Sequence, residues 1–296
     1  MPIFMCNTCG TQFNPADKPP ANCPICDDER QFVLPTGQAW TTHEALAKRS
    51  YNGWRELEPD LFSITTFPAF GIGQRAQLLR TPNGNILWDC ISLCDAATVA
   101  LIKAMGGIKG IAISHPHYYS SMAEWSHAFG GVPIHLHEAD KRWIMRDDPA
   151  VSLWKGETKE ILPGITLICV GGHYPGGTVL HWDKGAGGTG ALLSGDIVQV
   201  VADNKSVSFM WSFPNFIPLS APAVERIVRI LKPYSYDRVH GAFNDRTVWS
   251  ISDRAGTTNR IRLRFASEPL SFACRLRDVG LPGWQLDADS PARTVQ

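Results

Sequence analysis

The chain has 296 residues, which is long enough for one large domain and a small additional module. Hydrophobic residues make up 44% and charged residues 19%, as in globular proteins that bury a sizeable core. The 28 basic residues balance the 28 acidic ones, so composition gives no reason to expect nucleic acid or an anionic membrane as a partner. The sequence shows neither a signal-peptide pattern nor an apolar run of about 18 residues that would span a membrane. We therefore expect a cytoplasmic protein; the composition does not predict its oligomeric state.

Four of the eight cysteines form two Cys-x-x-Cys pairs near the N-terminus. In a reducing compartment this spacing indicates a metal site rather than disulfides, because four thiolates bind Zn²⁺ or iron tetrahedrally. The pattern resembles zinc ribbons and the short rubredoxin-like modules of rubrerythrins. We predict a four-Cys knuckle over residues 1–36 and favour zinc over iron, because no redox partner is evident. Its ligands are Cys6, Cys9, Cys23 and Cys26. The remaining cysteines are interpreted as buried free thiols: Cys90, Cys94, Cys169 and Cys274.

Strand and helix patterns alternate from Leu61 onward, after a connecting segment over residues 37–60 with a short helix. Apolar or β-branched runs bounded by turn residues predict the strands. They are Phe62–Phe67, Ala76–Arg80, Asn85–Asp89, Gly110–Ser114, Pro133–His137, Ile165–Val170, Thr178–Trp182 and Ala191–Ser194. Residues 81–84 are expected to form a hairpin turn, and residues 184–190 a flexible loop.

Three helices are predicted from capping residues at the start and glycine or proline at the end. They are residues 96–105 with Asp95 as cap, 122–129 with Ser121 and Glu124 as a capping box, and 221–232 after Ser220. We also expect one or two helices in the last fifty residues. The order of strands, helix and strands recurs in both halves, as two facing sheets covered by helices require. The expected fold is α+β, a four-layer αββα sandwich over residues 37–296.

Candidate metal ligands follow several of these strands. His115 and His117 lie in a loop after a strand, where imidazoles at i and i+2 can converge on one ion. His173 follows another strand in a glycine-rich turn that lets the backbone approach an ion. Asp196 and His240 each end a further strand. The His-x-His pair alone is weakly diagnostic, because surface and core histidines explain most such pairs.

The ordered series is more specific. A strand followed by His-Pro-His, then Gly-Gly-His173-Tyr-Pro-Gly, then Ser-Gly-Asp196, then His240-Gly resembles the metallo-β-lactamase superfamily over about residues 60–245. Asp89 also matches the Asp that this family carries at the end of an early strand. The resemblance implies the αββα fold and a first metal site formed by the three histidines before Asp196. It implies that Asp196 reaches this site and that His240 belongs to a second one.

The sequence departs from the family at the second metal site. The family's Asp and second His fall on Tyr119 and Ser120, and neither is a usual zinc ligand. Only Asp196 and His240 remain for a second ion, which is too few for a tight site. We therefore predict one metal ion in the sandwich, with zinc as the expected ion and iron as the open alternative there and in the knuckle. Three nearby side chains that could rescue a second ion have structural explanations instead: Glu124, His127 and Tyr119.

The resemblance predicts a metal-dependent hydrolase acting on a small molecule. A zinc ion held by three imidazoles can supply hydroxide at neutral pH, and Asp196 can act as its base or orienting group. Tyr118 or Tyr119 is positioned to donate a hydrogen bond to a developing oxyanion, and we take Tyr119 as the catalytic residue together with Asp196. One metal suits an ester, thioester, lactone or amide better than a phosphodiester. Aromatic residues between 211 and 216 form either an apolar substrate wall or part of the core.

Two other functions stay open on the sequence. The first is a non-catalytic binding or scaffold relative, which Tyr119 and Ser120 suggest. The second is an iron redox protein with a rubredoxin-like knuckle. Flavodiiron-type sites carry Glu where this chain has His117, and no flavodoxin-like region is present. A further pair, His135 and His137, lies on one face of a predicted strand and is interpreted as structural.

Overall fold

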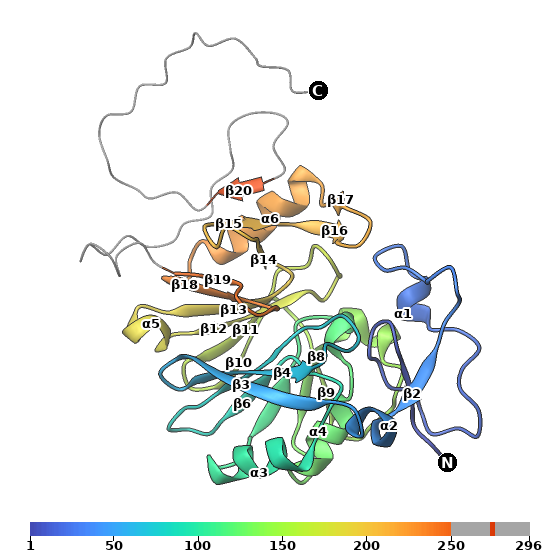
Figure 1. Cartoon of the computed structure of the whole chain (residues 1–296). Coiled ribbons are helices and arrows are strands. Elements are labelled where there is room, and N and C mark those ends of the chain that lie inside the picture. The colour runs from blue at the N-terminus through green and yellow to red at the C-terminus, as the bar shows by residue number, and fades with distance from the viewer. Residues whose placement is uncertain (250–272, 276–296) are drawn as a thin grey trace, which may run out of the picture.

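The computed structural model describes residues 1–249 and 273–275. Two facing sheets form its centre (Figure 1). The first has the strand order β3-β4-β5-β6-β7-β8-β9. Its strands are β3 Tyr51–Glu58, β4 Leu61–Phe67, β5 Ala76–Leu79, β6 Ile86–Trp88, β7 Gly110–Ala112, β8 Ile134–His137 and β9 Val151–Trp154. The second has the order β10-β11-β12-β13-β18-β19. Its strands are β10 Thr158–Leu162, β11 Ile165–Cys169, β12 Thr178–Trp182, β13 Ala191–Gly195, β18 Arg238–Gly241 and β19 Thr247–Val248.

Helices cover the two outer faces. Figure 1 shows α3 (Ala96–Ala104) and α4 (Met122–Ala128) on the first sheet and α6 (Ala221–Leu231) on the second. The apolar side of α6 explains its position, because Val224, Ile227 and Leu231 recur at helical spacing and are buried with strand residues of the second sheet. The predicted α+β, four-layer αββα architecture is confirmed.

An apolar layer lies between the two sheets, where Leu61 and Trp88 of the first sheet pack with Leu180 and Leu193 of the second. All four side chains are at most 1% exposed. Because strand side chains alternate, each sheet presents one apolar face to this layer and the other to its helices. The loops after β7, β11 and β13 carry the candidate ligands.

The predicted strands and helices are confirmed, with ends that differ by one or two residues. Asp95 caps α3 by accepting a hydrogen bond from the Thr98 amide at 2.9 Å. The capping box proposed for α4 is wrong. The hydroxyl of Ser121 donates to the Ile91 carbonyl instead, and Glu124 pairs with Arg146. The insert at residues 184–190 contains a short turn, α5 (Gly185–Gly188), rather than only a loop.

The N-terminal segment lies beside the sandwich, at the right of Figure 1. It contains β1 (Phe4–Cys6) and α1 (Pro24–Asp27), and β1 pairs with β2 (Trp40–Thr42). This pairing reaches past residue 36, the boundary predicted for the knuckle, and α2 (His43–Ala47) follows. The segment shares an apolar cluster with the sandwich, in which Cys9 and Cys23 pack with residues such as Trp125 and Trp143.

The remaining elements are short. They are the 3-10 turns η1 Pro116–Tyr118 and η2 Glu138–Trp143 and the strands β14 Gln199–Val200, β15 Ser206–Ser208, β16 Met210–Ser212, β17 Ile217–Pro218 and β20 Ala273–Arg275. Among the described residues, no helix has the length and apolar character needed to cross a membrane. The helices predicted in the last fifty residues and the thiol of Cys274 lie outside what the structure describes.

Candidate metal centre

The candidate ligands of the sandwich are placed by loops that leave the strands. His115 and His117 lie at the turn η1 after β7, and Asp196 directly follows β13. His173 follows β11 after Gly171 and Gly172, which have φ of +70° and +88°. A Cβ on Gly172 would lie 2.9 Å from side-chain carbons of Leu219 and Ile227, so the turn that carries His173 requires glycine there.

His115, His117 and His173 converge as the sequence predicted. One ring nitrogen from each lies within 4.8 Å of the others, and the three side chains are 1–2% exposed. They come from two loops that are more than fifty residues apart in the chain. This is the spacing that one tetrahedral ion with imidazole ligands needs.

The hydrogen bonds of the outer nitrogens orient two of these rings. Nδ1 of His173 lies 3.1 Å from the Met210 carbonyl, which can only accept, so Nδ1 carries the proton and Nε2 keeps its lone pair. Nε2 of His117 lies 2.9 Å from the hydroxyl of Tyr174. The inner atoms, Nε2 of His173 and Nδ1 of His117, face each other at 3.2 Å. Metal-binding histidines are typically held by such partners on the nitrogen that does not bind the ion.

The third ring completes the arrangement. Nδ1 of His115 lies 2.9 Å from the hydroxyl of Ser114, and its Nε2 lies 3.2 Å from Oδ1 of Asp196. Neither Nε2 of His115 nor Oδ1 of Asp196 has a hydrogen-bond partner among the described residues, although both are buried. Unpaired buried polar atoms are costly, and two that converge beside two more imidazoles fit a cation between them.

Burial controls the charge of this group. It lowers the pKa of His115 and His117 well below the usual value. It also lowers the pKa of His173 to about 4, with a smaller contribution from the positive charge of Arg30. The imidazoles are therefore neutral at pH 7 and present lone pairs. Burial raises the pKa of Asp196 to about 7, and interaction with the Tyr118 hydroxyl lowers it in part. These donors suit a divalent ion that prefers nitrogen and oxygen ligands.

Of the two candidate tyrosines, Tyr118 adjoins the site. Its ring centroid lies 4.4 Å from that of His115, and its hydroxyl interacts with Asp196. Tyr119, the predicted catalytic residue, is 2% exposed and has Asp140 and Tyr174 as its charged or ionisable neighbours. The structure therefore puts the adjacent residue, and not Tyr119, beside Asp196.

Ser120 and His240, at the positions of the family's second metal site, make contacts with other residues. The hydroxyl of Ser120 lies 2.8 Å from that of Ser92 and donates weakly to the Gly10 carbonyl of the knuckle at 3.4 Å. His240, predicted as a ligand of the second site, is not part of the group formed by the three imidazoles. Its Nε2 lies 2.9 Å from Oε1 of Glu58 on β3. The role of His240 as a ligand thus gains no support from its position.

The four cysteines of the knuckle form a second group. Their sulfur atoms lie within 4.8 Å of one another, all four side chains are at most 1% exposed, and all are free thiols. Each pair closes a similar turn. The Gly10 amide donates to the Cys6 carbonyl at 2.8 Å, and the Cys26 amide donates to the Cys23 carbonyl at 3.0 Å. Hydrogen bonds from neighbouring thiols lower the pKa of Cys6, which favours a thiolate there. Four such sulfurs fit a tetrahedral ion.

Three residues that support the histidines were missed from the sequence. They are Ser114, Tyr174 and Arg30, and each contacts a histidine or its neighbour. Ser114 and Tyr174 directly adjoin ligands in the chain, which is the signal that could have identified them. Arg30 lies in the knuckle, and no local pattern connects it to the sandwich.

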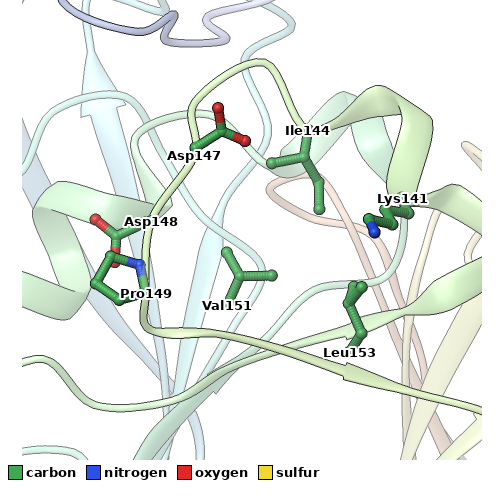
Figure 2. A pocket seen from close by; sticks show the side chains of 7 residues that line it. All are labelled: Lys141, Ile144, Asp147, Asp148, Pro149, Val151 and Leu153. Carbon is green, nitrogen blue, oxygen red and sulfur yellow. The ribbon is translucent and has the colours of Figure 1, made fainter.

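A separate hollow lies at the edge of the first sheet. It has a volume of about 370 Å³. Figure 2 shows Ile144, Val151 and Leu153 among the side chains that line it. The lining contains none of the three histidines. Its carboxylates are already engaged, because Asp147 binds Asn14 and Asp148 pairs with His127. We therefore assign no site to it.

Comparisons with known proteins agree with this fold. No family model matches the chain. The chain is 47% identical over 246 residues to the uncharacterized protein YmaE of Bacillus subtilis (strain 168), an alignment that covers 82% of this chain and 89% of YmaE. Among solved structures, DIM-1 metallo-β-lactamase and VMB-1 both give a TM-score of 0.52, at 15% and 12% identity. Each match covers 66% of this chain and 90% of the other. The chain thus has the metallo-β-lactamase fold and belongs to the same family as YmaE.

Proposed function

We propose that this protein is a metal-dependent hydrolase that holds one zinc ion in the sandwich and a second in the four-Cys knuckle. The observation that carries the proposal is the convergence of three buried, neutral imidazoles next to the unpaired oxygen of Asp196. The ligands of the sandwich ion would be Nε2 of His115, Nδ1 of His117 and Nε2 of His173. When bound there, zinc supplies a Lewis acid and a water whose pKa is lowered to about 7.

Asp196 would orient and deprotonate the attacking water. Its Oδ1 lies 3.2 Å from Nε2 of His115, and it has no competing hydrogen-bond donor at that oxygen among the described residues. A carboxylate this close to the three imidazoles could accept a hydrogen bond from the attacking water. The hydroxyl of Tyr118, which interacts with Asp196, would donate a hydrogen bond to the developing oxyanion.

A single sandwich ion favours acyl transfer to water. Tyr119 and Ser120 provide no usual zinc ligand, and His240 is bound to Glu58. A carbonyl needs polarisation at one oxygen, whereas phosphodiester cleavage usually benefits from two ions. We therefore propose an ester, thioester, lactone or amide of a small molecule as substrate. The Phe213 ring, 5.6 Å from that of His173, supports an apolar group on that substrate.

The free cysteines bear on the compartment in which the protein works. Eight cysteines occur in the chain, and seven of them are free in the described residues. Four free thiols held within bonding reach of one another persist best under reducing conditions or around an ion. We propose that the protein works in the cytoplasm.

Metal analysis of purified variants tests the proposal. We expect about two zinc ions per chain in the wild type and about one in His115→Ala and in His173→Ala, because the four-Cys group still binds its ion. The control is His127→Ala, which removes an imidazole that pairs with Asp148. Wild-type protein should hydrolyse at least one member of an ester, thioester, lactone and amide panel, and both ligand variants should be inactive. A wild type saturated with only one zinc ion would refute the sandwich site, and full metal without turnover would leave a binding role.

A further inference from the structure

Arg30, a cation of the knuckle segment, contacts residues of the histidine group. The side chain of Arg30 is 4% exposed, and Asp28 pairs with its Nε at 2.5 Å. Its guanidinium lies 4.1 Å from the ring centroid of Tyr174 and 4.6 Å from that of Trp211. A guanidinium that lies over two aromatic rings is held in place by both of them, because its plane and its charge can interact with the ring faces.

Arg30 contacts the structure that carries two of the proposed ligands. One of its terminal nitrogens donates to the carbonyl of His173 at 3.3 Å. The ring on which it stacks belongs to Tyr174, whose hydroxyl lies 2.9 Å from Nε2 of His117. One side chain therefore fixes the backbone of one ligand and the hydrogen-bond partner of another.

Hydrogen bonds from Ser212 and Asn215 also hold the backbone around Arg30. The hydroxyl of Ser212 donates to the Arg30 carbonyl at 3.1 Å. The side-chain amide of Asn215 donates to the carbonyls of Glu29 and Gln31, each at 3.2 Å. In the chain, Arg30 follows Cys26 by only four residues. An ion in the four-Cys group would fix this turn and, through it, the place of the guanidinium.

We propose that Arg30 is a positioning residue for the sandwich metal site, through which the four-Cys knuckle sets the affinity of that site for its ion. This inference rests on the proposed function, since it requires an ion among the three histidines. Arg30 binds no ion itself. It holds Tyr174 and the His173 carbonyl, which fix the ring orientations of His117 and His173. Partners of metal ligands typically change metal affinity by about 10- to 100-fold when they are removed.

The test measures metal affinity at the histidine site in the full chain. One equivalent of zinc is added first to the metal-free chain, so that it fills the four-thiolate knuckle and leaves the histidine site empty. Co²⁺ is then titrated with a competing chelator, and its d–d absorption reports the histidine site. We expect Arg30→Met to raise the Co²⁺ Kd about 10- to 100-fold. The matched control is Arg142→Met, which removes an exposed cation stacked on Trp143 at 4.5 Å that has no contact with a ligand.

Two further variants separate positioning from general loss of structure. Arg30→Lys keeps the charge and the fold but loses the planar stacking, and we expect at least a fivefold rise in Kd. Arg30→Met combined with Tyr174→Phe should weaken Co²⁺ binding by less than the product of the single effects, because Arg30 acts largely through Tyr174. Far-UV circular dichroism verifies that each variant is folded.

The outcomes distinguish this inference from the function on which it rests. If Arg30→Met and Arg30→Lys keep the Kd within twofold of wild type, Arg30 only stabilises the knuckle and the inference is overturned. Fully multiplicative effects of the Arg30 and Tyr174 substitutions would overturn it as well. If the wild type with one zinc ion in the knuckle shows no Co²⁺ d–d absorption at all, the sandwich site itself is absent and the proposed function fails.

Discussion

Nε2 of His240 lies 2.9 Å from Oε1 of Glu58, so a histidine at the end of β18 is paired with a carboxylate from β3. Both side chains are nearly inaccessible, and Glu58 also pairs with Arg238. The pair connects the two sheets away from the three imidazoles. We expect His240→Ala to retain about two zinc ions per chain while it lowers the free energy of unfolding. Loss of an ion in this variant would show that His240 is a ligand after all.

Glu58 stabilises the fold more than an exposed carboxylate does. Replacing it with alanine removes the shared acceptor of the buried His240 and the half-buried Arg238. We expect Glu58→Ala to lower the free energy of unfolding by about 3 kcal/mol or more, as for other broken buried pairs. Glu124→Ala, which breaks a partly exposed pair with Arg146, should cost about 1 kcal/mol or less. Urea denaturation measures both, and equal losses would contradict this assignment.

The two neighbouring tyrosines should differ in their effect on turnover. Tyr118 interacts with Asp196, whereas Asp140 and Tyr174 are the ionisable groups that act on Tyr119. We expect Tyr118→Phe to lower kcat by about 10²-fold, the typical effect of losing one oxyanion donor. Tyr119→Phe should leave kcat near that of the wild type. Steady-state kinetics on the best substrate of the panel decides between them, and the reverse order would restore the catalytic role to Tyr119.

Gly10 joins the knuckle to the sandwich through a tight contact. Its φ is +80°, and a Cβ there would lie 2.3 Å from the hydroxyl oxygen of Ser92. We expect Gly10→Ala to lower the free energy of unfolding by roughly 1–3 kcal/mol through backbone strain, with a further loss from the clash. Gly37→Ala is the matched control, because Gly37 has φ +84° with open space around it. Similar urea-unfolding losses for both would show that the contact with Ser92 is unimportant.

His135 should make stability depend on acid. Burial lowers its pKa to about 4, and the positive charge of Lys159, whose Nζ lies 3.3 Å from Nδ1, lowers it further. The unfolded chain takes up a proton near pH 6.5 and the folded chain only near pH 4, so stability falls as the pH drops through this window. We expect His135→Gln to lose less free energy of unfolding between pH 7 and pH 4.5 than the wild type. His137→Gln, on the same strand face, is the control, and an unchanged slope in His135→Gln would refute the prediction.

The sequence predicted the parts of this structure that depend on local pattern. Alternation and turn residues located β4 to β8 and β11 to β13, and caps located α3 and α6. The strands β3, β9 and β10 were missed, because residues such as Arg55 and Lys159 interrupt their apolar pattern and pairing with a neighbour creates the strand. Two-residue strands such as β14 likewise depend on a partner far along the chain.

The same limit applies to the site. His115, His117 and His173 follow strands in recognisable motifs, so their convergence could be predicted. The partner of His240 could not be predicted, because Glu58 lies 182 residues away in the chain. The contact of Arg30 with the His173 carbonyl spans 143 residues and depends on how the knuckle docks. Contacts of this kind follow from the packed structure rather than from any short motif.

Anomalous diffraction at the zinc edge from crystals of the full chain tests the central claim most directly. We expect two peaks, one among the four Cys sulfurs and one at about 2.0–2.1 Å from Nε2 of His115, Nδ1 of His117 and Nε2 of His173. A single peak at the knuckle, in crystals grown with excess zinc, would contradict the claim that these three imidazoles form a metal site.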